Sequence, residues 1–150
     1  MVYQIIYSSE SSTPMQWEDL EEILERARSS NFRKGITGAL LYVDGVFLQI
    51  LEGERACLQE LMERIFKDVR HEKVTILKAG EVDTAAFADW KMAYVSATTE
   101  QVAKWAGLGG TTALPSIVNE MRQDPQRVAQ LAQSVVTILV AAPTERARAE

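Results

Sequence analysis

The stretch that decides the fold covers residues 36–53 and reads ITGALLYVDGVFLQILEG. It contains two apolar runs, residues 36–43 and 46–51, on either side of Asp44 and Gly45. An Asp-Gly pair accepts the positive φ angles of a type I′ turn, whose twist matches that of two antiparallel strands. The sequence therefore predicts a tight β-hairpin here.

Upstream of the hairpin, the sequence predicts a strand followed by a helix. Residues 2–8 are apolar on both alternating faces, which favours a strand in the middle of a sheet. Thr13 and Gln16 have the spacing of a capping box, so we expect the helix to begin there. Helical periodicity then turns Asn31 toward the same inward side as the apolar stripe, which consists of Leu20, Ile23, Leu24 and Ala27.

Downstream of the hairpin, the pattern predicts a second amphipathic helix that ends at Arg70, and then two strands over residues 74–82 and 87–95. The apolar residues of this helix are Leu58, Leu61, Met62, Ile65, Phe66 and Val69. The order of elements is therefore βαββαββ. Two helices on one face of a mixed five-stranded sheet make a ferredoxin-like sandwich, so we expect an α+β fold.

The C-terminal part of the chain has a different pattern. We expect residues 1–96 to form one domain and residues 97–150 to form a helical extension. The last predicted helix has a buried stripe, and Val136, Ile138 and Val140 make its end apolar on several sides. Such an end must be covered, either by the open face of the sheet or by another subunit.

Composition excludes several classes of protein. Sixteen basic and twenty-one acidic residues give a net charge of −5, which disfavours nucleic acid and anionic membranes as partners. Cys57 is the only cysteine and His71 the only histidine, so neither a disulfide framework nor a His/Cys metal site is expected. We expect His71 to be an exposed cap at a helix end. No run of eighteen apolar residues and no signal-peptide pattern is present, so the expected location is cytoplasmic.

Several polar or special residues occupy positions where a plain core would be apolar. Gln49 lies in a strand that is apolar on both faces, where it either bonds a neighbouring backbone group or faces a ligand. Tyr7 is either a half-buried aromatic residue or a hydrogen-bond partner of Gln49 on a neighbouring strand. Asn31 either terminates its helix or faces a ligand.

Two further pairs also have an ordinary structural interpretation. Trp90 and Met92 alternate with Lys91 as a packing stripe, and Arg64 and Asp68 have the i,i+4 spacing of a solvated ion pair. The glycines of the chain match neither common phosphate-loop pattern, and no catalytic triad, carboxylate dyad or metal cluster can be assembled. We therefore expect no enzymatic activity and no metal.

Taken together, four segments resemble the BLUF family, which senses blue light with FAD. They are Tyr7-Ser8-Ser9, Asn31 followed by residues 35–40, residues 47–53, and residues 89–92, in this order and spacing. The resemblance covers about residues 1–96. It implies a non-covalent flavin, with FMN or riboflavin left open beside FAD.

The resemblance also implies roles for single residues. Ile23 and Ile65 would flank the flavin ring, and Asn31 would bond its pyrimidine edge, whereas the neighbouring Ser30 varies in the family. Gln49 would reach the N5/O4 side while bonding Tyr7. The ring edge or the ribityl-phosphate arm would be contacted by Arg64, Asp68 and Arg70.

The mechanism implied by the resemblance starts with electron and proton transfer from Tyr7 through Gln49, which leaves the hydrogen bonds of the flavin rearranged. Trp90 and Met92, on the last strand, would sense this change, with Trp90 also a competing electron donor. Which of the two lies nearer to Gln49 stays open. Output would pass through the C-terminal helices to a protein partner, in a homo-oligomer. The alternatives are a flavin-dependent oxidoreductase and a ligand-free ferredoxin-like interaction module.

Overall fold

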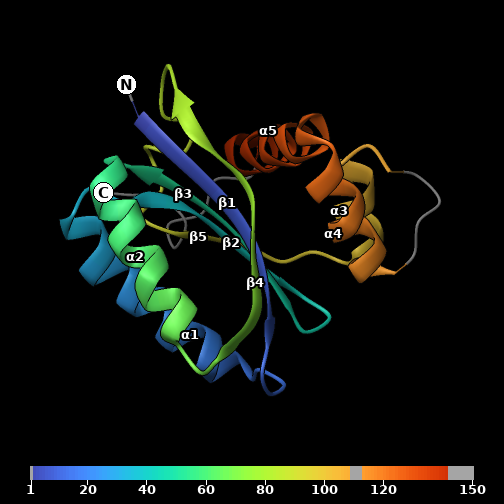
Figure 1. Cartoon of the computed structure of the whole chain (residues 1–150), viewed down its shortest axis with the longest axis horizontal. Helices are drawn as coiled ribbons and strands as arrows, with labels where there is room; N and C mark the ends of the chain where they lie inside the picture. The colour runs from blue at the N-terminus through green and yellow to red at the C-terminus, as the bar shows by residue number, and fades with distance from the viewer. Residues whose placement is uncertain (1, 109–112, 142–150) are drawn as a thin grey trace.

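The computed structural model describes residues 2–108 and 113–141. It has five strands in the order β4-β1-β3-β2-β5, with helices on both faces (Figure 1). The elements are β1 (Val2–Ser11), α1 (Trp17–Arg26), the π-helical turn η1 (Ala27–Asn31), β2 (Thr37–Val43), β3 (Val46–Gly53), α2 (Arg55–Lys67), β4 (His71–Val82), β5 (Ala93–Val95), α3 (Thr99–Trp105), α4 (Leu114–Gln123) and α5 (Pro125–Ala141). The α+β, ferredoxin-like fold with C-terminal helices is confirmed.

The hairpin forms the centre of the sheet. Asp44 and Gly45 have φ angles of 47° and 80°, the positive values of a type I′ turn, as predicted. β3 pairs antiparallel with both β1 and β2, and β5 pairs in parallel with β2 at the edge. The mixed sheet therefore places β1 and β3 side by side in its interior.

The sheet has an apolar core on each face. On one face, α1 and α2 cover side chains such as Ile5 and Leu51. On the other face, α3, α4 and α5 cover side chains such as Ile6 and Ile50. The C-terminal helices thus pack on the open face of the sheet, and the buried stripe of α5 is Val128, Leu131, Ala132, Val135 and Leu139.

The proposed division at residue 96 stays a prediction, and residues 109–112 and 142–150 of the extension lie outside the described residues. At the apolar end of α5, Val140 keeps 58% of its surface exposed. None of the helices in the described part has both the length and the apolar character needed to cross a bilayer.

Two predicted helix boundaries were wrong. α1 begins at Trp17, not near Thr13, because Gln16 is the N-cap and its backbone N–H donates to Asp19 Oδ2 at 2.9 Å. α2 ends at Lys67, not at Arg70, because Asp68 adopts an extended conformation. The Asp68 carboxylate then accepts the backbone N–H of Arg70 at 2.9 Å, which stabilises the turn into β4.

The predicted strand over residues 87–95 was also too long, since β5 contains only Ala93–Val95. Before it, the chain turns, with the backbone N–H of Trp90 donating to the carbonyl of Phe87 at 3.1 Å. Trp90 and Met92 therefore do not share one face. Trp90 packs in the core with the C-terminal helices, and Met92 packs in the core with α1 and α2.

Candidate functional site

A pocket lies on the face of the sheet that α1 and α2 cover. Its cavity volume is about 150 Å³, and it is partly open to solvent. The pocket is lined by all the predicted site residues except Trp90 and Met92, namely Tyr7, Ile23, Asn31, Gln49, Arg64, Ile65, Asp68 and Arg70. The fold thus brings together side chains from five elements and the turn before β4.

The middle of the pocket is apolar. α1 contributes Ile23 and α2 contributes Ile65, while Leu40 and Phe47 line it from the sheet. Phe47 is fully buried, and it shares a strand face with Gln49 two residues later. A space lined by branched aliphatic side chains from both helices, Ile23 of α1 and Leu61 and Ile65 of α2, suits a flat aromatic ring, as the flavin interpretation requires.

A buried chain of side chains leads out of the pocket. Tyr7 and Gln49 are opposite each other in the β1–β3 register, and the hydroxyl of Tyr7 donates a hydrogen bond to Gln49 Oε1. Gln49 Nε2 donates to the sulfur of Met92 at 3.4 Å. Of the two interpretations of Tyr7, the structure therefore shows the hydrogen bond to Gln49. Of Trp90 and Met92, it is Met92 that contacts Gln49.

The protonation state of Tyr7 follows from its surroundings. Burial raises the pKa of the Tyr7 hydroxyl well above its usual value of 10.0, and the negative charge of Asp68 raises it further. The hydroxyl therefore stays protonated at neutral pH and acts as a donor. Gln49 has two amide protons, so one donor position remains beyond its contact with Met92.

Asn31 supplies a polar group at another part of the wall. Ala27–Asn31 form a π-helical turn at the end of α1, and Asn31 is 8% exposed. Within residues 2–108 and 113–141, its side-chain amide has no hydrogen-bond partner. An amide that donates and accepts at one edge matches the donor and acceptor groups of a flavin pyrimidine edge.

The rim of the pocket carries charge. Arg70 Nη2 lies 2.7 Å from Asp68 Oδ2, and Arg70 Nε donates to Asp68 Oδ1 at 3.1 Å. These hydrogen bonds hold the pKa of Asp68 at about 2 and raise that of Arg70. Arg64 lines the same rim without an ion pair in the described part of the chain. The predicted i,i+4 ion pair between Arg64 and Asp68 was wrong, because α2 ends at Lys67 and Asp68 is no longer helical.

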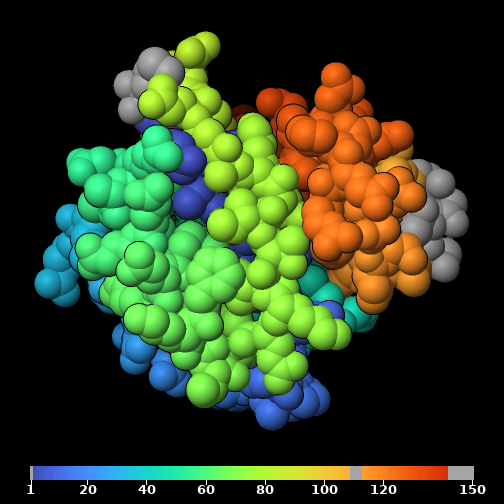
Figure 2. All heavy atoms as spheres, in the orientation of Figure 1, coloured from blue at the N-terminus to red at the C-terminus, as the bar shows by residue number. Residues whose placement is uncertain are grey.

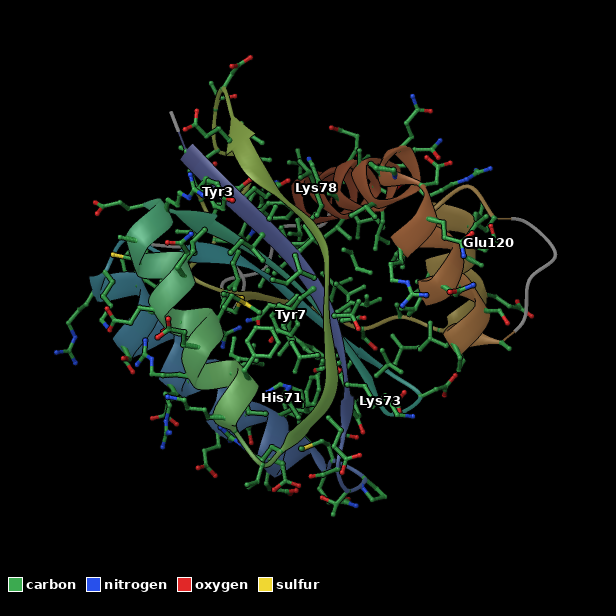
Figure 3. All side chains as sticks on the ribbon, viewed as in Figure 1. Tyr3, Tyr7, His71, Lys73, Lys78 and Glu120 are labelled. Carbon is green, nitrogen blue, oxygen red and sulfur yellow. The ribbon has the colours of Figure 1, made fainter. Side chains whose placement is uncertain are left out.

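The sequence analysis did not identify His71 as a pocket residue. Its prediction that His71 is an exposed helix cap was wrong. It begins β4, lines the pocket and bonds Ser9 Oγ through Nδ1 at 2.8 Å. Its ring lies 4.8 Å from the ring of Phe47, and Figure 3 shows it below Tyr7 on the same side of the sheet. Burial lowers the pKa of His71, and Arg70 lowers it further against the opposing effect of Asp68.

Other lining residues could have been found only in part from the sequence. Phe47 follows from the alternation that places it beside Gln49, and Ser30 from its place next to Asn31. Arg26 also lines the pocket, but no sequence pattern marked it. Among the described residues, no three His, Cys, Asp or Glu side chains gather as a metal site would need.

Trp90 lies on the other face of the sheet. It is 3% exposed, and its indole Nε1 is buried without a hydrogen-bond partner among the described residues. Its ring lies 6.4 Å from that of Phe87. Trp90 is therefore placed to contact the C-terminal core rather than the pocket.

Comparisons with known proteins found both a matching family and similar solved structures. The family described as sensors of blue-light using FAD, BLUF, matches residues 2–93. The photoactivated adenylate cyclase subunit beta of Euglena longa is 35% identical over 105 residues, which are 69% of this chain and 12% of that protein. The chain thus spans about an eighth of the length of this curated relative.

Two solved structures cover nearly the whole chain. BlrB, a BLUF protein in its dark state, is 28% identical with a TM-score of 0.73, and the alignment covers 92% of this chain and 97% of BlrB. The photo-activated state of BlsA is 29% identical with a TM-score of 0.77, covering 91% of this chain and 95% of BlsA. Both similarities extend past the matched family region into the C-terminal helices.

Proposed function

Because the chain belongs to the BLUF family, whose members sense blue light using FAD, we propose that it is a photoreceptor that holds a non-covalent flavin between α1 and α2. The observation that carries the proposal is the buried chain of side chains from Tyr7 through Gln49 to Met92 at the wall of the pocket. FAD is the cofactor of the family, and FMN or riboflavin would fit the same apolar slot.

The lining of the pocket supports the following binding roles. Ile23 and Ile65 would enclose the flavin ring, and the amide of Asn31 would bond its pyrimidine edge. Arg64 and the Asp68–Arg70 pair lie at the rim, where they would contact the ring edge or the ribityl-phosphate arm. When bound, the flavin supplies absorption of blue light and an excited state that accepts an electron.

Tyr7 and Gln49 perform the proton step. Tyr7 donates the electron, and its phenolic proton leaves Oη along the existing hydrogen bond to Gln49 Oε1. Gln49 takes this proton on its oxygen and releases one from Nε2 toward the pocket. Loss of the Nε2 proton leaves Gln49 as its imidic acid tautomer. Return of the electron and of that proton restores the phenol and the amide, and rotation about the Cγ–Cδ bond in between would leave the amide with its donor and acceptor positions exchanged. The cycle therefore ends with a changed hydrogen-bond pattern and no net chemistry, and it relaxes thermally.

The rearranged amide of Gln49 provides an output. Its contact with Met92 changes, and Met92 directly precedes β5, from which the chain continues to α3. We assign the output to protein contacts of the C-terminal helices, with a partner protein and a homo-oligomer, and without enzymatic turnover by the described residues. The photoactivated cyclases among the relatives are much longer proteins. The cytoplasmic location stays a prediction that cell fractionation can check.

A visible absorption spectrum of the purified protein tests the proposal, recorded in the dark, after blue light and during dark recovery. We expect a yellow protein with a small, reversible red shift. A yellow protein that bleaches, or that turns over NAD(P)H steadily, would instead make it a flavin-dependent oxidoreductase. A colourless protein that does not bind added flavin would instead support the ligand-free interaction module. Size-exclusion chromatography in the dark and in the light then tests the homo-oligomer.

A further inference from the structure

Glu52 is a carboxylate buried in the middle of the fold. It lies on β3, three residues after Gln49, and none of its surface is exposed. Since alternate residues of a strand face opposite sides, Glu52 lies on the face of the C-terminal helices, like Ile50, and Gln49 lies on the face of the pocket. A buried carboxylate is costly unless several donors compensate for the lost water.

Three N–H donors surround this carboxylate. The backbone N–H of Phe87 donates to Glu52 Oε1 at 2.7 Å, and that of Ala86 donates to Oε2 at 3.1 Å. Gln4 Nε2 donates to Oε2 at 2.9 Å, while Gln4 Oε1 accepts from Lys78 Nζ at 3.0 Å. Figure 3 shows Lys78 on the side of β4 that faces α5. The side-chain amide of Gln4 therefore bridges the ammonium group of Lys78 and the carboxylate of Glu52.

The two backbone donors belong to the segment that carries Trp90 and Met92. Residues 86–92 form no regular strand or helix, so their position depends on a few separate hydrogen bonds. Glu52 holds the start of the segment, and the N–H of Gly38 donates to the carbonyl of Trp90 at 3.2 Å in its middle. At its end, Arg28 Nε donates to the carbonyl of Met92 at 3.0 Å.

From these contacts we propose that Glu52 is a positioning residue for the contact between Gln49 and Met92. β3 would then act on Met92 in two ways, directly through Gln49 and indirectly through the segment that Glu52 holds. Glu52 does not line the pocket, so it acts on the recovery of the lit state rather than on flavin binding. The inference rests on the proposed photoreceptor function, since it concerns the return of Gln49 to its dark position.

The direct test is Glu52→Gln. This change replaces one acceptor oxygen with an NH₂ group that faces N–H donors, so at least one of the bonds to residues 86–87 is lost. A looser Met92 lowers the barrier to rotation of Gln49, and the loss of one hydrogen bond corresponds to a recovery about fivefold faster. Flavin content and the size of the red shift stay unchanged. The matched control is Glu81→Gln, the same substitution at an exposed glutamate of β4.

A double-mutant comparison separates positioning from general destabilisation. In a Met92→Leu background, Glu52→Gln should no longer change the recovery rate, because the contact through which it acts is gone. An equal acceleration in both backgrounds, or none in either, would overturn the inference. If Glu52→Gln does not fold, Glu52→Asp replaces it, since its shorter arm keeps the charge but cannot reach both backbone N–H groups.

A second measurement does not depend on the photocycle. In protein with ¹³C-labelled methionine methyl groups, the Met92 resonance should move in Glu52→Gln while that of Met62, buried in the same core as Met92, stays in place. An unmoved Met92 resonance would refute the positioning role whether or not the protein responds to light. Conversely, a wild-type protein without any light-induced shift would refute the photoreceptor function, even if the Met92 resonance moved as expected.

Discussion

Gln49 and Met92 are 43 positions apart in the chain, yet the amide nitrogen of one lies 3.4 Å from the sulfur of the other. This contact joins the wall of the pocket to the residue that precedes β5. Sulfur is a weak hydrogen-bond acceptor, so the contact holds the amide loosely compared with an oxygen partner. Gln49 is therefore placed between a strong partner, Tyr7, and a weak one, which suits a side chain that has to rotate.

The first prediction concerns Gln49 itself. Gln49→Leu keeps the size of the side chain but removes both the acceptor for Tyr7 and the donor for Met92. We expect flavin to bind and the red shift to disappear, as measured by difference absorption spectra. The Tyr7 hydroxyl is left buried without a partner, which lowers the free energy of unfolding by about 1–3 kcal/mol. A normal red shift in this variant would disprove the role of the amide.

Tyr7→Phe tests the electron and proton donor. Removing the hydroxyl leaves the ring packing intact but eliminates the proton that moves to Gln49 Oε1. We expect the reversible photocycle to be lost while flavin content stays near that of the wild type. Flash photolysis provides the measurement. A photocycle of ordinary yield would mean that another residue, such as Trp90, donates equally well.

The opposite placement of Met92 and Trp90 gives a matched pair of variants. Met92→Leu removes the sulfur that Gln49 contacts, so dark recovery should become faster, by about fivefold at most because sulfur is a weak acceptor. Trp90→Phe alters the core on the other face and should lower the stability by about 1–3 kcal/mol with little effect on recovery. Recovery kinetics and urea unfolding separate the two effects. The reverse pattern, with only Trp90→Phe changing recovery, would contradict the assignment.

Low pH should lower the stability of the protein, because Asp68 at the rim of the pocket becomes protonated. The hydrogen bonds from Arg70 hold the pKa of Asp68 at about 2, below its usual value of 3.8. Because the folded state binds this proton less tightly than the unfolded chain, the carboxylate stabilises the fold above pH 3.8 and loses this contribution as the pH falls toward about 2.

Urea unfolding midpoints over this acid range measure the effect. Asp68→Asn is the control, since it carries no titrating carboxylate and should lose less stability between the two pH values. Identical pH profiles for Asp68→Asn and the wild type would show that the Arg70 pair contributes nothing.

The last prediction concerns the close approach of two strands. Gly38 has a φ of +156°, and a Cβ there would lie 1.8 Å from the carbonyl oxygen of Ile50. Gly38→Ala should therefore destabilise the protein by about 3 kcal/mol. Gly80→Ala is the control, since nothing lies within 4 Å of its added Cβ. Thermal unfolding compares the two, and equal melting temperatures would contradict this account.

Much of the fold could be predicted because it depends on local patterns. The Asp44-Gly45 turn, the two amphipathic helices and the buried stripe of α5 follow from turn chemistry and periodicity. Figure 2 shows α2 and β4 packed against each other at the surface, as the predicted sandwich requires. Helix ends were less accurate, because a single side chain such as Asp19 or Asp68 decides where the first or last turn stops.

The candidate site, like the fold, could be predicted from the sequence only in part. The buried positions of Gln49 and Asn31 follow from strand alternation and helical spacing, so the sequence by itself determined that polar groups would lie within the apolar core. Only the tertiary structure decided that Met92 contacts Gln49, that Trp90 lies on the other face of the sheet, and that His71 lines the pocket. Residues 86–92 follow no periodic pattern, because their course is set by hydrogen bonds that they donate to Glu52 and accept from Arg28, both distant in sequence. Periodicity reports which side of an element is buried, whereas the direction of an irregular segment depends on partners that only the folded chain brings together.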